Sequence, residues 1–162
     1  MHRHTCELSL AGRLLLWSWR HAVRAQRRRQ DLPHFVLYTL AQLPQGERVA
    51  ARAESLFAHW VLGASRSLLL ACPDEVRLSR DEGILIEALI AAHFGFEDEV
   101  RLLLAEQQHG GGLRRTTRAC LELARLIRDL DLSISIRTSA FVFEASPGLL
   151  ETSGTQPAPR QI

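Results

Sequence analysis

The first residues of the chain carry side-chain types that bind metal ions, with His2, His4 and Cys6 at every second position. Structural zinc sites usually take four ligands from two separated pairs, and no second pair follows at such spacing. The other two cysteines, Cys72 and Cys120, lie far from Cys6 and from each other. This spacing favours three reduced thiols in a cytoplasmic protein. We therefore predict neither a metal site nor a cofactor.

A second pattern with chemical meaning is His109 followed by three glycines, which forms part of the oxyanion hole in some esterases. That chemistry also needs a nucleophile in a G-x-S-x-G turn between a strand and a helix, and the sequence contains no such pentapeptide. Phosphate-binding glycine loops, H-E-x-x-H and C-x-x-C are missing as well. We expect residues 109–112 to be a flexible link between helices, and the protein not to be an enzyme.

Glu87 is the most interesting carboxylate, because it lies within the most apolar stretch, residues 81–94. If this carboxylate were buried alone, its pKa would be raised, and such shifts occur at functional sites. Structural ion pairs shift pKa values as well, so pairing with an arginine of the first or last helix is one alternative. Exposure to solvent is the other. Glu87 is thus a candidate buried carboxylate.

Arginine supplies all 20 basic residues of the chain. Its planar guanidinium binds phosphate and carboxylate as a fork, although a GC-rich genome also explains the absence of lysine. The helix that we predict over residues 8–29 carries an arginine-rich side, which fits a solvated face, a phosphate-binding face or a membrane-surface helix. The candidate interaction or phosphate-binding face comprises Arg13, Arg20, Arg24, Arg27, Arg28 and Arg29.

The net charge of +2 conceals an uneven distribution along the chain. Residues 1–30 contain seven arginines and one acid, whereas residues 74–106 contain nine acids and three arginines. Docking of the basic segment on the acidic one, within one chain or between two copies, is therefore an alternative to ligand binding.

The apolar helix near residues 81–94 should form the centre of the fold, because it has no polar side to offer to water. Ser79 and Glu82 have the spacing of a capping box at its start. Gly95 interrupts this helix, and the acids at 97–99 suit the first turn of the next one. Further helices are predicted at residues 8–29, 33–43, 47–61, 66–72 and 113–131.

An internal similarity relates residues 58–71 to residues 92–105 at an offset of 34, the period of tetratricopeptide repeats, but no third copy follows. We infer from this similarity that the helices pack in repeat-like pairs. After the last helix, alternating apolar residues predict a small β-hairpin over residues 132–143. Such a hairpin must lean on the helices or pair with another chain. The composition of residues 145–162 predicts a disordered tail.

Together these patterns predict one mainly α domain over residues 1–144, a bundle of five to seven helices with weakly repeat-like hairpins and a small C-terminal β-hairpin. No apolar run reaches the ~18 residues of a membrane span. We expect a cytoplasmic, non-catalytic protein–protein interaction protein, a regulator or adaptor that self-associates as a homodimer. The alternative is a nucleic-acid-binding regulator that uses the arginine face of the first helix.

Overall fold

The computed structural model of the chain describes residues 4–27 and 45–136, which contain one short 3-10 turn and five α-helices and no named strand. The predicted mainly α fold is thereby confirmed for this part of the chain. The predicted helix at 33–43, the hairpin beyond Ile136 and the tail at 145–162 lie outside the described residues. The elements are η1 (Thr5–Glu7), α1 (Leu10–Arg27), α3 (Gly46–Leu62), α4 (Arg80–His93), α5 (Glu97–Ala105) and α6 (Gly110–Asp129).

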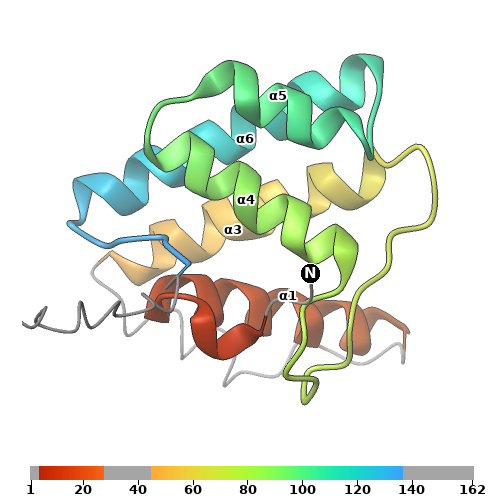
Figure 1. The fold of residues 1–162 in the computed structure, drawn as a ribbon, viewed down its shortest axis with the longest axis horizontal. Helices are drawn as coiled ribbons and strands as arrows, with labels where there is room; N and C mark the ends of the chain where they lie inside the picture. Colours follow the sequence, from red (N-terminus) through yellow and green to blue (C-terminus); the bar gives the residue numbers. More distant parts are fainter. Residues whose placement is uncertain (1–3, 28–44, 137–162) are drawn as a thin grey trace, which may run out of the picture.

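Helix α4 is the centre of the fold, as its lack of a polar side predicts. It packs against α5 and α6 and crosses in front of α3 in Figure 1. Both halves of the predicted capping box are present: the Ser79 hydroxyl accepts from the Glu82 N–H at 3.2 Å, and the Ser79 N–H donates to Glu82 Oε2 at 2.8 Å. Most of its apolar side chains, including Leu85 and Leu89, are buried on all sides.

Helices α3 and α6 form an antiparallel pair behind α4 (Figure 1). The predicted inward face of α6, which includes Cys120, Leu123 and Ile127, is buried. The prediction of a flexible link at residues 109–112 is wrong for its glycines, because Gly110 already begins α6. A Cβ atom on Gly112 would lie 2.8 Å from the carbonyl oxygen of Gly63, so the close approach of α6 to the end of α3 requires glycine.

The prediction of a helix at residues 66–72 is also wrong. Residues 64–79 instead form a long non-helical connection from α3 to the start of α4 (Figure 1). Two N–H groups of this connection, those of Leu69 and Ala71, donate to the carboxylates of Asp81 and Glu82 at 2.6 and 3.1 Å. Because the second element of the first proposed helix pair is not helical, the two halves of the 34-residue similarity do not share a fold.

Helix α1 covers the core from the side of α3. Trp19 Nε1 donates to the Ala53 carbonyl at 3.2 Å, and its ring stacks on Phe57. Just before α1, the Ser9 N–H donates to the Ser135 carbonyl at 2.9 Å, and a single antiparallel bridge joins Leu8 to Ile136. Ser135 and Ile136, which fall in the range of the predicted hairpin, thus lie along the N-terminal segment. None of the helices in the described part of the chain has both the length and the apolar character of a membrane span.

Candidate functional site

The deeply buried carboxylates of α4 are Asp81 and Glu82, at its first turn, and not Glu87. Asp81 and Glu82 are 0% and 1% exposed, whereas Glu87 is half-buried and has an interaction partner. The sequence pattern assigned Glu82 only to the capping box and did not single out Asp81 as a buried carboxylate. The side chains that face them decide what these two carboxylates do.

Glu82 forms a bidentate ion pair with Arg20 of α1. Arg20 Nε and Nη2 each lie 2.8 Å from one carboxylate oxygen, and both side chains are almost fully buried. The remaining donors of the guanidinium reach the backbone carbonyls of Glu75 and Arg77 at 2.5 and 2.8 Å. Docking of the basic segment on the acidic one was an alternative to ligand binding, and Arg20 makes such a contact within the chain, at the junction of α1, α4 and the 64–79 connection.

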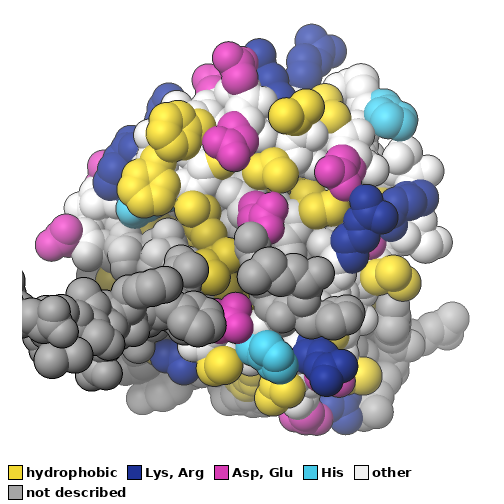
Figure 2. Space-filling view, in the orientation of Figure 1, with side chains coloured by type: hydrophobic (Ala, Val, Ile, Leu, Met, Phe, Trp, Pro, Cys, Tyr) yellow, Lys and Arg dark blue, Asp and Glu magenta, His cyan; other side chains and the backbone are white. Residues whose placement is uncertain are grey.

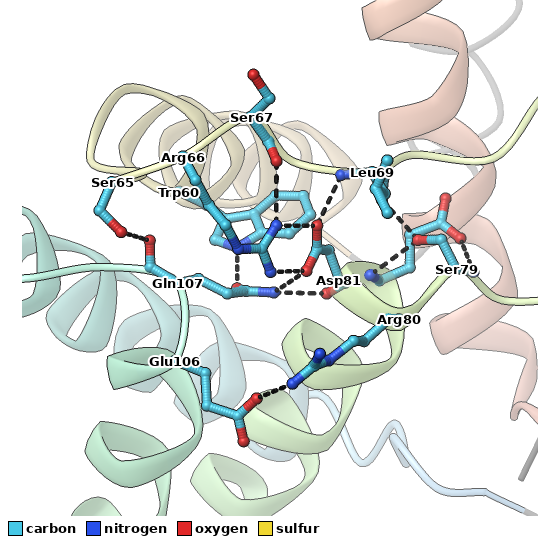
Figure 3. Close-up of polar contacts among 11 residues, drawn as sticks. Trp60, Ser65, Arg66, Ser67, Leu69, Ser79, Arg80, Asp81, Glu106 and Gln107 are labelled. Carbon is cyan, nitrogen blue, oxygen red and sulfur yellow. Dashed lines mark hydrogen bonds and ion pairs between the residues drawn. The ribbon is translucent and has the colours of Figure 1, made fainter.

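Asp81 forms the matching pair with Arg66 of the connection (Figure 3). Arg66 Nη1 and Nη2 lie 2.9 and 2.5 Å from the two carboxylate oxygens, and Gln107 Nε2 lies 3.1 Å from one of them. Burial acts to raise the pKa of the Asp81 carboxyl, but the hydrogen bonds from Arg66, the Leu69 N–H and Gln107 outweigh it and hold the pKa below its ordinary value. Asp81 is therefore ionised near neutral pH.

Gln107, which no sequence pattern singled out, joins three elements at this point (Figure 3). Its Oε1 accepts from Trp60 Nε1 of α3 at 2.6 Å, and its carbonyl accepts from the Ser65 N–H at 2.9 Å. A pair of glutamines before a glycine run is typical of a polar link in sequence. Only the fold places one of them in the interior, where it is 0% exposed.

The two buried carboxylates act as a structural clasp. Each of their four oxygens accepts two hydrogen bonds, one from an arginine and one from a backbone N–H or from Gln107. A carboxylate offers about four lone-pair sites, so these are saturated. In this arrangement Asp81 and Glu82 hold the 64–79 connection against α1 and α4 and have no free acceptor for a ligand.

Of the six arginines of the candidate face, the structure describes the side chains of three, Arg13, Arg20 and Arg24, and these lie in different surroundings. Arg20 is buried in the clasp, because the connection folds over that side of α1. Arg13 is exposed, and Arg24 lies 4.0 Å from Asp74. The side chain of Arg27, and all of Arg28 and Arg29, lie outside the described residues. The spacing of these arginines was compatible with one exposed face, but Arg20, in the middle of that face, is buried.

An exposed apolar feature lies at the turn between α4 and α5. Phe94 and Phe96 are 62% and 58% exposed, with ring centroids 6.4 Å apart. The turn is a Schellman motif, in which the Phe96 N–H donates to the Ala91 carbonyl and the Gly95 N–H to the Ala92 carbonyl, at 2.9 and 3.1 Å. Gly95 has φ +85°, a left-handed conformation that favours glycine. The backbone thus fixes both aromatic residues at the surface.

A groove of about 510 Å³ continues from this turn toward the segment after α6. Its apolar walls include Ile90, Leu103 and Ile136 together with both phenylalanines, and Glu87 and Glu99 add carboxylates. In Figure 2, hydrophobic side chains gather on this face with acidic side chains among them. We call this surface the α4–α5 groove.

Comparison with known proteins identifies no relative. No protein-family model, curated protein or solved structure matches the chain. The site must therefore be interpreted from its own geometry.

Possible metal ligands and the cysteines also bear on what chemistry the chain can perform. In residues 4–27 and 45–136, no three side chains among His, Cys, Asp and Glu gather closely enough to hold a metal ion. The three cysteines are free, as their spacing predicted. Cys120 is fully buried in α6, and burial raises the pKa of its thiol above the ordinary value, which disfavours the reactive thiolate.

Proposed function

We propose that the protein is a non-catalytic interaction protein, a regulator or adaptor, whose α4–α5 groove binds an apolar and basic segment of a partner protein. The observation that carries the proposal is the exposed pair Phe94 and Phe96 on a turn fixed by backbone hydrogen bonds. A backbone that is already fixed loses little conformational entropy on binding, and phenylalanine is among the aromatic residues enriched in the cores of protein interfaces.

The charges around the groove support a basic occupant. Glu99 lines it, and Glu97 and Asp98 are exposed on the first turn of α5, whereas Glu87 also lines it but already has an interaction partner. Arg101 also lies on α5, but it pairs with Glu97 at 2.7 Å. Two copies that met through identical α4–α5 faces would bring these acids together, which is unfavourable. A partner segment with arginine or lysine beside apolar side chains avoids that repulsion.

The test uses two synthetic amphipathic peptides with leucine and phenylalanine on one helical face. One carries lysine on the other face, and its matched control carries glutamate at the same positions. Fluorescence anisotropy of the labelled peptides is measured against the wild-type chain and against a variant with Phe94→Ser and Phe96→Ser. The control variant carries Leu62→Ser and Leu69→Ser, because these leucines are 84% and 64% exposed but do not line the groove.

We expect the lysine peptide to bind the wild-type chain and the leucine control, and the phenylalanine variant to bind about tenfold or more weakly. The glutamate peptide should not bind. Equal binding of both peptides, or unchanged affinity in the phenylalanine variant, would refute the proposal. Light-scattering mass is recorded in parallel. If the wild-type chain is a dimer and only the phenylalanine variant is a monomer, the groove binds a second copy of the chain and not a partner segment.

A further inference from the structure

A second groove, of about 470 Å³, lies between the start of α3 and the end of α6. Figure 1 shows these two ends side by side in the antiparallel pair. Arg48 and Arg52 of α3 face Arg125 of α6 across the groove, and Ala51 and Leu126 also line it. No residue lines both this groove and the α4–α5 groove. We call it the α3–α6 groove.

The positive charge of the α3–α6 groove is only partly neutralised. Glu122 accepts from Arg52 at 2.7 Å and from Arg118 at 2.9 Å, so one carboxylate orients two guanidinium groups. Arg48 donates to the neutral side-chain amide of Gln45. Within the described part of the chain, neither Arg48 nor Arg125 forms an ion pair. Asp129 is the other carboxylate of the groove, so its lining carries three guanidinium groups and two carboxylates, a net charge of +1.

The arrangement suits a polymer of phosphates better than a single anion. Arg114, Arg118 and Arg125 follow one side of α6 at steps of four and seven residues and are all exposed. At 1.5 Å per residue this row extends over roughly 16 Å, and a nucleic-acid strand places one phosphate per ~3.4 Å of duplex axis. Planar guanidinium groups bind phosphate oxygens in a bidentate manner. The row is therefore long enough to meet several consecutive phosphates.

We infer that the α3–α6 groove, together with this arginine row of α6, binds the phosphate backbone of a nucleic acid. This site is independent of the proposed α4–α5 function. It also differs from the arginine face predicted on α1, whose central member, Arg20, is buried in an ion pair. The contacts are to phosphate, so binding does not depend on base sequence and weakens as salt concentration rises.

The experiment measures anisotropy of a fluorescein-labelled duplex DNA and of a labelled single-stranded RNA with the full chain over a series of salt concentrations. The test variant carries Arg48→Gln, Arg52→Gln and Arg125→Gln. The control variant carries Arg77→Gln, Arg80→Gln and Arg101→Gln, which removes the same charge from exposed positions elsewhere. Circular dichroism melts verify that both variants fold, and both should, since every replaced side chain is exposed.

We expect the groove variant to lose about tenfold or more in affinity at low salt, and its slope of log K against log salt on duplex DNA to become shallower by about two to three. The control variant should keep the wild-type slope. If the two variants lose equal affinity, or if neither probe binds the wild-type chain at low salt, the inference is overturned. A polyglutamate peptide that competes for the groove as tightly as the nucleic acid would overturn it as well, since the ligand would then be an acidic protein. The probe that the groove binds more tightly, DNA or RNA, identifies which nucleic acid supplies the phosphates.

Discussion

Replacing Glu82 with glutamine isolates the charge of the buried clasp from its shape. Glutamine has nearly the same volume as glutamate and keeps one carbonyl oxygen, so cavity formation contributes little. The variant leaves the Arg20 guanidinium with its contacts to two backbone carbonyls but without a counter-charge, in a position that is 3% exposed. Removing one member of a buried ion pair costs about 3–5 kcal/mol, because the other charge stays buried and unpaired.

The backbone contacts of Glu82 add to this loss. Its two oxygens also accept from the N–H groups of Ala71 and Ser79 at 3.1 and 2.8 Å. A glutamine amide presents one acceptor and one NH₂ group, so it cannot serve both N–H donors and Arg20. Four donors point at the two Glu82 oxygens and an amide oxygen accepts from about two of them, so two donors lose their acceptor, each at a cost of about 1–3 kcal/mol where no water replaces the bond. We therefore expect Glu82→Gln to lower the free energy of unfolding by at least about 3 kcal/mol.

Urea unfolding followed by circular dichroism measures this difference, and a thermal melt should show a midpoint lower by roughly 6–20 °C for about 3–5 kcal/mol in a chain of this size. The matched control is Glu97→Gln, which breaks the exposed pair with Arg101 on α5. Exposed pairs at this helical spacing contribute only about 0.3–0.5 kcal/mol. If Glu82→Gln destabilises the protein no more than Glu97→Gln does, the assignment of the clasp as a buried and essential ion pair is refuted.

Two other changes test the packing and the charge of the fold. Gly112→Ala should destabilise the protein by about 1–3 kcal/mol, because the new Cβ would meet the Gly63 carbonyl oxygen at 2.8 Å. Gly83→Ala, inside α4, should stabilise it by about 0.5–1 kcal/mol, because the new Cβ meets no atom within 4 Å and alanine favours the helix. Urea midpoints of the two variants that move in the same direction would contradict this contrast. Asp81 has a lower pKa in the folded chain than its ordinary value of about 3.9, so its contribution is complete above about pH 4 and is lost as pH falls through the folded pKa. Stability measured between neutral and acidic pH should therefore fall more steeply in the wild-type chain than in Asp81→Asn, and parallel profiles would exclude Asp81 as the cause.

The helices that the sequence predicted well are those with local signals. The capping box at Ser79, the glycine that ends α4 and the apolar period of α6 each depend on neighbouring residues, and each is present. The helix predicted at 66–72 failed because its competitor was distant in sequence. The N–H groups of Leu69 and Ala71 bond to carboxylates 12 and 11 residues away, and no local pattern announces this.

The candidate site shows the same division. Local spacing placed Arg13, Arg20 and Arg24 on one side of a helix, but it could not show that the 64–79 connection covers the middle of that side. The sequence marked Gly95 as a helix boundary but did not predict that Phe94 and Phe96 are exposed, because their exposure depends on the Schellman turn and on what packs beside it. Glu87 attracted attention for its apolar neighbours, yet the buried acids are those at the polar start of the same helix.

The arginines of this chain occur in three different environments, and these explain why the net charge alone does not indicate a partner for this protein. Arg20 is neutralised in the interior by Glu82, and Arg101 is paired on the surface with Glu97. Arg48 and Arg125, in contrast, keep their charge within the described part of the chain. Arg48 and Arg125 thus place unpaired positive charge on α3 and α6, while the exposed acids of α5 lie beside the α4–α5 groove. Since these surfaces share no lining residue, the proposed basic protein segment on one would leave room for the proposed phosphate backbone on the other.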